Sequence, residues 1–521
     1  MAGVVKNMPE KKIKQWYARV SEQLKICFFT AVIIGFAAHL YKITNWLPNW
    51  DSLVFRYDNQ NMVSMGRWFL PVICTLSSFY DLPLLNGVLA IVFHALGACV
   101  ICRMFNLKSA VSAGLTGALA AAFPTVTSVM MYNYVADGYA FSFLLMCLAA
   151  YFMTKERPNY PLAALFITLG TAIYQAYISV AVMLLLLYLI DSLLSAETSA
   201  KAATRKSVGF LLTGAAGMAV YYAVMLILPK IMHIEFLDYQ GFSTAASMPG
   251  IDIAGSLYAV KHIFIDYFFD FSAGVNLFSV LNIVVLLLTV IFYILLAAKG
   301  GAFGSAGKII LLALFVCLLP IGANILVFAN SGIDYHNIMK MGYIVFYLFF
   351  IISYERADFL REKMRIKWKW AVLATSAVMI FNNIIIANVS YHKLQMAFEK
   401  SYAELIRITD RIEQTDGASD CGEILVIGAL GGSEAYSSDL PPDMTGTTDG
   451  FILRADDEVV GQSVFCSAIN DYCAKDYKFL YGERKKEMLA KDEVRAMKAW
   501  PDKSSVLALD GVVVLKLGEE K

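Results

Sequence analysis

Long apolar segments recur through the first three quarters of the chain, and they decide what it can fold into. About eleven of them approach the roughly 20 apolar residues that a helix needs to cross a bilayer. Composition agrees, because 58% of the 521 residues are hydrophobic and 16% are charged, whereas a soluble domain is roughly half apolar and a quarter charged. The sequence predicts a polytopic α-helical membrane protein. The expected spans are 26–44, 82–104, 110–130, 137–154, 159–174, 177–195, 208–231, 276–298, 308–329, 338–355 and 370–390.

Two segments need a separate interpretation. Residues 67–80, RWFLPVICTLSSFY, are apolar but short and contain Pro71, so we expect a helix that lies on the membrane surface. The stretch IYQAY at 173–177 is interpreted as a turn between two spans and not as the middle of one long helix.

Basic residues give the spans a direction. Lysines and arginines precede the first span and follow the second, fourth, sixth, eighth and tenth, and examples are Lys25, Arg103, Lys155, Arg205, Lys299 and Arg361. Cytoplasmic loops carry an excess of Lys and Arg. The N-terminus is therefore expected in the cytoplasm, and an odd number of spans places the C-terminus outside the cell membrane.

The composition changes after about residue 391. The stretch AFEKSYAELIRITDRIEQ is typical of an amphipathic soluble helix, and EILVIG, SVLALD and VVVLKLG are typical of strands. We expect three parts: a cytoplasmic segment (1–25), a membrane domain (26–390) and a small extracytoplasmic α/β domain (391–521), which is long enough for its own core.

Charge and cysteine spacing exclude some functions. The net charge is +1, which gives no indication of nucleic acid as a partner. No cysteine or histidine spacing matches a zinc site, so no metal site is predicted, although a divalent metal is left open as a cofactor. Cys466 and Cys473 are close enough in sequence to pair, which an oxidising exterior would allow.

Polar residues collect in the loops expected outside. They are Asp51, Asp58, Arg67 and Trp68 in the first loop, Asp137 in the second, Tyr174 and Gln175 in the third, Lys261 and His262 in the fourth, and Lys340 after the fifth. Ordinary roles compete with functional ones. Asp58 can pair with Arg56, Asp137 can stabilise a helix start through its dipole, and Arg67 can extend along the apolar surface beside Trp68.

Carboxylates outside, a lipid-embedded body and no nucleotide-binding loop fit sugar transfer from a lipid-linked phosphate. A carboxylate can take the proton from the acceptor hydroxyl, and Asp51, Asp58 and Asp137 are the catalytic candidates. An arginine can hold the phosphate with two hydrogen bonds. The candidates for substrate binding are Arg67, Trp68, Tyr174, Gln175, Lys261, His262 and Lys340.

Three short blocks also carry a family resemblance. GRWFLP at 66–71, AAFPTV at 121–126 and IYQAYIS at 173–179 resemble the type II O-antigen glucosyltransferase (Gtr) family, membrane glycosyltransferases of the GT-C type. The resemblance covers about 40–380. It implies transfer of glucose from a polyprenyl-phosphate donor to a cell-surface glycan or lipid-linked acceptor. Family members often show adjacent acids in the first loop. Here Ser52 follows Asp51, so the second acid would be Asp58 or Asp137.

Two other functions stay open at this point. A transporter or flippase for lipid-linked saccharides would need polar groups and broken helices at mid-membrane depth, whereas the polar residues here lie mostly at one edge. A non-catalytic assembly partner of a surface polysaccharide pathway would work through the C-terminal domain alone.

Overall fold

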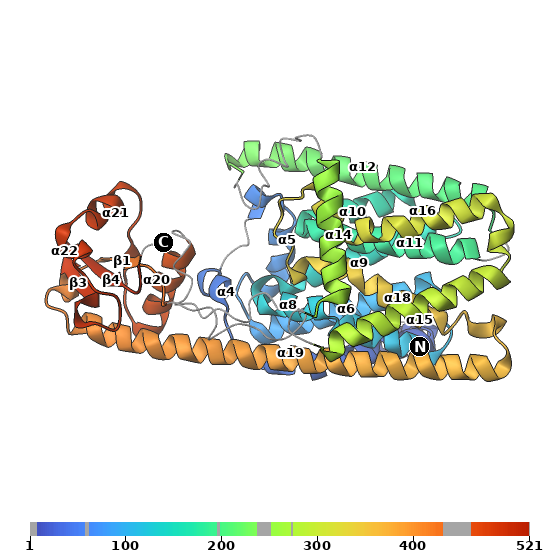
Figure 1. Cartoon of the computed structure of the whole chain (residues 1–521), viewed down its shortest axis with the longest axis horizontal. Coiled ribbons are helices and arrows are strands. Elements are labelled where there is room, and N and C mark those ends of the chain that lie inside the picture. The colour runs from blue at the N-terminus through green and yellow to red at the C-terminus, as the bar shows by residue number, and fades with distance from the viewer. Residues whose placement is uncertain are drawn as a thin grey trace.

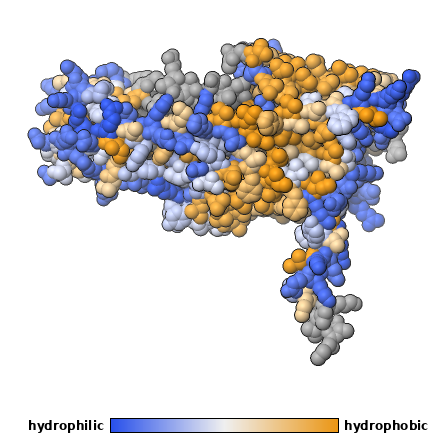
Figure 2. Space-filling model, turned by 90° about the horizontal axis from the view of Figure 1, so that it is seen from below, coloured by the Kyte–Doolittle hydropathy of each residue, from blue (hydrophilic) through white to orange (hydrophobic). Residues whose placement is uncertain are grey.

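The computed structural model describes residues 8–57, 62–194, 198–236, 252–271, 275–430 and 460–519. Long helices run side by side in one bundle, a small α/β domain lies at the opposite end of the molecule from the N-terminal segment, and one very long helix joins the two (Figure 1). On the face shown in Figure 2, hydrophobic residues form a broad band across the bundle, with hydrophilic surface on either side of it. This is the surface of a protein whose middle is in contact with lipid.

Ten helical stretches of the described residues are long and apolar enough to cross a membrane. With the shorter apolar helix α10 (Tyr160–Ile173), each of the eleven predicted spans overlaps a helix, and the predicted fold class is confirmed. The ten are α3 (Glu22–Thr44), α6 (Pro83–Met104), α7 with α8 (Ala110–Met131), η3 with α9 (Asn133–Thr154), η4 with α11 (Gln175–Leu194), α12 (Ala200–Met232), α15 (Leu277–Lys299), α16 (Ala306–Ala323), η6 with α18 and η7 (Asn337–Phe359), and α19 (Glu362–Glu413).

Local signals set where these helices begin. Ser21, Asn159 and Asn276 cap α3, α10 and α15 by accepting hydrogen bonds from backbone N–H groups of the first turn, which otherwise have no partner. Pro83 and Pro124 open α6 and α8, at a position where the missing N–H costs nothing. The predicted turn at 173–177 is the short 3₁₀ helix η4 (Gln175–Tyr177), and this prediction is confirmed.

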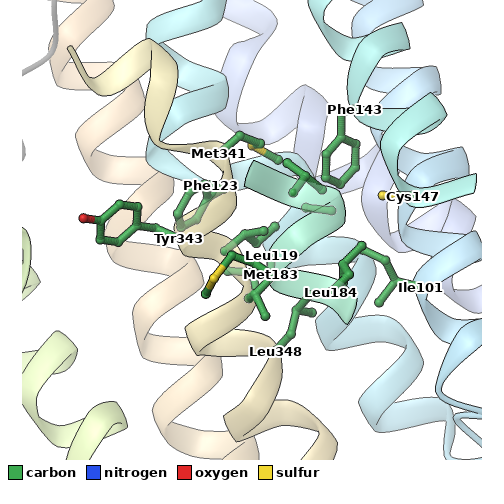
Figure 3. Close-up of a cluster of buried hydrophobic side chains, with 14 of the residues drawn as sticks. Ile101, Leu119, Phe123, Phe143, Cys147, Met183, Leu184, Met341, Tyr343 and Leu348 are labelled. Atoms are coloured by element: carbon green, nitrogen blue, oxygen red, sulfur yellow. The ribbon is translucent and has the colours of Figure 1, made fainter. Parts of the chain in front are cut away.

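Small residues allow the spans to approach closely. A Cβ on Gly117 of α7 would lie 2.2 Å from the Cys27 carbonyl oxygen of α3, so only glycine permits this backbone contact. The centre of the bundle is filled by apolar side chains from several spans (Figure 3). Phe143 of α9, Leu184 of α11 and Leu348 of α18 are each at most 1% exposed, and together they hold the spans in register.

Shorter elements lie between the spans. They are α2 (Pro9–Arg19), α4 (Trp50–Val54), η1 (Met62–Met65), α5 (Leu70–Cys74), η2 (Thr75–Ser77), α14 (Ile253–Phe269), η5 (Ala302–Gly304) and α17 (Ile325–Ala329). α14 runs crosswise to the long helices (Figure 1). The helix predicted over 67–80 is shorter, because only residues 70–77 are helical, as α5 and η2, and its location on the membrane surface stays a prediction. Pro71 sits in the first turn of the five-residue α5, and Ser78 and Phe79 have positive φ angles, which end the helical run.

The C-terminal domain is built on a four-stranded sheet with the order β2-β1-β4-β3. β1 (Glu423–Ile427) is parallel to β2 (Lys478–Phe479) and to β4 (Val512–Lys516), while β3 (Val506–Leu509) is antiparallel to β4. The helices of the domain are α20 (Val460–Cys473), α21 (Gly482–Leu489) and α22 (Asp492–Arg495), and its 3₁₀ turns are η8 (Ala418–Asp420) and η10 (Lys503–Ser505). The three predicted strands are confirmed, and the two-residue β2 was not foreseen.

Two features join this domain to the bundle. α19 continues without a break through the predicted boundary at 391. Trp50 and Leu53 of α4 are buried in the same apolar cluster as Leu405 and Phe465 of the C-terminal part. The pairing considered for Cys466 and Cys473 is not formed. Both are free thiols, and the Cys466 thiol donates instead to the Tyr477 carbonyl at 2.9 Å.

Candidate active site

An apolar groove of about 360 Å³ opens where several spans end on the side of the C-terminal domain. Its walls come from η1, the α10–α11 turn, α12 and α17, and most of the lining is apolar. The lining residues are Met65, Arg67, Thr171, Tyr174, Gln175, Ala176, Ile178, Met218, Tyr221, Tyr222, Met225, Ile325, Leu326, Ala329, Asn330, Ile333 and Met339. A groove of this kind suits a long apolar chain with a polar group at one end.

Arg67 supplies the cation of the apolar groove. Arg67 follows the turn after η1. Gly66 in this turn has a φ of 73°, a conformation that favours glycine. Its Nη1 donates a hydrogen bond of 2.9 Å to the Tyr139 hydroxyl, and the guanidinium lies 4.9 Å from the centre of the Tyr174 ring. The two tyrosine rings are stacked at 4.1 Å. The guanidinium is therefore held in a fixed position by α9 and the α10–α11 turn.

Gln175 forms hydrogen bonds to two walls of the groove. Its Nε2 donates to the Met65 carbonyl at 2.7 Å and to the Tyr221 hydroxyl at 3.2 Å. The structure thus brings together three of the predicted substrate-binding residues, Arg67, Tyr174 and Gln175. Trp68 packs beside Phe69 and the cluster around Tyr221, and it does not line the groove.

Asp51 lies in the first turn of α4 and is half-buried. The Asn49 side chain caps this helix by accepting the Ser52 N–H at 2.9 Å, which fixes the position of Asp51. Asp51 lines neither the apolar groove nor the second cavity described below.

The other predicted acid within the described residues, Asp137, does not line the groove either. Asp137 is fully buried and accepts hydrogen bonds from Asn86 Nδ2 at 3.3 Å and from the Gly138 N–H at 3.0 Å. It lines neither of the two cavities described in this section. Asp58 lies outside the described residues.

The remaining predicted cations are also outside the cavities. Lys261 and His262 lie on an exposed face of α14, where the His262 ring packs 4.3 Å from the Tyr258 ring. Lys340 is half-buried at a kink of η6. None of the three lines the apolar groove.

A second cavity, the aromatic cavity, was not predicted. It has about 390 Å³ and is lined by Trp46, Arg56, Tyr80, Asp81 and Tyr472. Asp81 is 6% exposed and accepts a hydrogen bond of 2.8 Å from Asn133 Nδ2. Burial raises the pKa of Asp81, while Lys42, Asn133, Ser52 and Arg56 act in the opposite direction. The one sequence signal was Lys42, an ionisable residue inside an apolar span, which marks a candidate site by default.

The sequence model of the family described as glucosyl transferase GtrII matches residues 40–353, which is more than half of the chain. The chain belongs to the GtrII glucosyl transferase family. It is accordingly a membrane-embedded glucosyltransferase. No curated protein and no solved structure matches it. The matched region of this GtrII protein contains α4 and the apolar groove, whereas Tyr472 and the rest of the C-terminal domain lie beyond it.

Proposed function

We propose that this GtrII protein transfers glucose from a polyprenyl-phosphate donor to a cell-surface glycan or lipid-linked acceptor. The observation that carries the proposal is the position of Arg67 on the wall of the apolar groove. A lipid-linked sugar phosphate needs apolar surface for its tail and a cation for its phosphate, and the groove combines the two.

The donor phosphate is both the binding handle and the leaving group. The acceptor hydroxyl attacks C1 of glucose, the bond between C1 and the phosphate oxygen breaks, and the electron pair leaves with the phosphate. Arg67 stabilises the charge that develops there, because a guanidinium presents two parallel N–H donors to phosphate oxygens. Tyr139 and Tyr174 keep this cation in place during the step.

Asp51 is proposed as the general base. The attacking hydroxyl loses its proton as the new bond forms, and a carboxylate within hydrogen-bonding reach can accept it. Asp51 is half-buried in the first turn of a capped helix, in the same loop of the chain that carries Arg67. Asp137 is assigned a positioning role, since its hydrogen bonds hold the start of α9 near α6.

The site is proposed to face the outside of the cell membrane. Supporting this orientation, the basic residues Lys25, Arg103 and Lys108 lie at the end of the bundle that carries the N-terminal segment, and positive charge marks the cytoplasmic side. With this orientation, the C-terminal domain at the end of α19 would lie on the outer side, at the opposite end of the molecule from the N-terminal segment (Figure 1).

The test uses the full-length protein in lipid nanodiscs with polyprenyl-phosphate [¹⁴C]glucose. The expected result is transfer of labelled glucose from the donor to an acceptor glycan extract, with slower hydrolysis of the donor by water. UDP-[¹⁴C]glucose supplied alone is expected to remain intact. Direct use of UDP-glucose, or no reaction with the lipid donor, would overturn the proposal.

A further inference from the structure

The aromatic cavity is walled by rings from three separate parts of the chain. Trp46 follows the first span, Tyr80 precedes the second, and Tyr472 belongs to α20 of the C-terminal domain. The Tyr80 ring packs 4.4 Å from the Tyr57 ring, and the backbones of these two residues pair antiparallel. Amphipathic rings of this kind offer both an apolar face and a polar edge to a ligand.

The cation of this cavity is already compensated. Arg56 Nη1 lies 3.2 Å from Asp471 Oδ2, and Arg56 Nη2 donates to the Tyr472 hydroxyl at 3.3 Å. The guanidinium also lies 5.3 Å from the centre of the Trp46 ring. Because its charge is balanced by a carboxylate, Arg56 favours a neutral ligand over a phosphate.

Asp81 provides a buried carboxylate to the wall of this cavity. Asn133 donates to its Oδ1 at 2.8 Å and the Ser52 hydroxyl also acts on the carboxylate, while its Oδ2 has no hydrogen bond of ordinary geometry to a described residue. A buried carboxylate with few donors is costly, and the nearby Lys42 offsets only part of that cost. A ligand that brings hydroxyl donors to this wall of the cavity would add to its hydrogen bonds.

These features describe one kind of ligand. A pyranose ring presents apolar C–H faces to aromatic rings and hydroxyl donors to a carboxylate. The volume of about 390 Å³ falls within the range of ordinary small-molecule sites. We propose that the aromatic cavity binds a neutral sugar ring of the acceptor glycan. That this sugar belongs to the acceptor rests on the proposed function, whereas the binding of a neutral sugar ring does not.

The experiment measures binding of neutral monosaccharides to the full-length protein in nanodiscs. The probes are the methyl glycosides of glucose, galactose, rhamnose and N-acetylglucosamine, observed by saturation-transfer difference NMR. At least one is expected to bind, and its affinity should fall roughly tenfold or more in Tyr472→Ala, because truncation of an aromatic anchor has effects of that size. Asp81→Asn should weaken the same glycoside, and Tyr472→Phe should weaken it less than Tyr472→Ala.

The matched control is Tyr481→Ala, an exposed tyrosine of the same domain that does not line the cavity, and it should bind like the wild type. If Tyr472→Ala does not fold, Asp81→Asn carries the test. Absence of binding by all four probes, or equal binding by the cavity variants and the control, would overturn the proposal. Loss of lipid-donor activity in the wild type with glycoside binding intact would instead contradict the proposed function and leave the sugar site standing.

Discussion

The Trp46 indole N–H donates a hydrogen bond of 2.8 Å to the Tyr472 hydroxyl, across 426 positions of sequence. This bond joins the loop after the first span to the C-terminal domain. Together with the burial of Trp50 and Leu53 against that domain, it makes the domain a wall of the aromatic cavity. The C-terminal domain is therefore packed against the first loop and forms part of this cavity.

Membrane orientation is the first prediction. Alkaline phosphatase, which is active only outside the cytoplasm, should be active when fused after the C-terminal domain and inactive when fused after Lys108, at the opposite end of the bundle. The measurement is the phosphatase activity of colonies that express each of the two fusions. An active Lys108 fusion would reverse the proposed side of the site.

Arg67→Ala should weaken donor binding. A hydrogen bond to a charged group contributes about 1.5–3 kcal/mol, so the KM for polyprenyl-phosphate glucose should rise roughly 10–100-fold. Arg67→Lys keeps the charge but loses the paired donors, so its KM for the donor should lie between that of Arg67→Ala and that of the wild type. Arg103→Ala, at the far end of the bundle, is the control. An unchanged donor KM in Arg67→Ala would remove this residue from the donor site.

The contribution of Asp81 to the stability of the wild-type protein should depend on pH. Burial raises the pKa of Asp81 above its ordinary 3.8, against the pull of Lys42, Arg56, Asn133 and Ser52. The folded protein thus holds the Asp81 proton more tightly than the unfolded chain does. Protonated Asp81 therefore stabilises the fold fully below about pH 3.8, the pKa in the unfolded chain, and this contribution is lost as the pH rises through the pKa in the folded protein.

Asp81→Asn stays neutral at every pH. The Tm of Asp81→Asn minus that of the wild type should therefore increase between about pH 4 and about pH 7. Thermal unfolding of both proteins in nanodiscs, at several pH values, measures this difference in Tm. A difference that shrinks with rising pH would mean that the charged form of Asp81 is the favoured one in the folded protein.

Close packing of α3 and α7 predicts a glycine requirement. A Cβ on Gly117 would clash with the Cys27 carbonyl, whereas a Cβ on Gly214 of α12 meets nothing within 4 Å. Gly117→Ala should lower the free energy of unfolding by about 1–3 kcal/mol, the usual cost of overpacking. Gly214→Ala is the control. Equal stability of the two variants would show that α3 and α7 are packed less closely than the structure indicates.

The sequence predicted the spans well, because each apolar run carries its own signal and lipid leaves the backbone few alternatives. Arg67, Tyr174 and Gln175, which the sequence places in loops expected on one side of the membrane, line one groove in the structure, and their role in binding stays a prediction. Asp81 was not among the predicted residues, because its neighbours Trp46 and Tyr472 are brought to it only in the folded chain. The distance of Asp137 from the groove could not be predicted either, since one sequence does not show how neighbouring spans rotate about their axes.

The central claim is that a carboxylate on α4 performs base catalysis in a lipid-dependent glucosyltransferase. Its most direct test is glucose transfer from polyprenyl-phosphate [¹⁴C]glucose by Asp51→Asn, at wild-type expression and Tm. General-base catalysis contributes roughly 10²–10⁴-fold, so turnover should fall by about that factor with the donor KM nearly unchanged. Asp334→Asn, an exposed aspartate in another loop, should retain full activity. Turnover by Asp51→Asn close to that of the wild type would contradict the account.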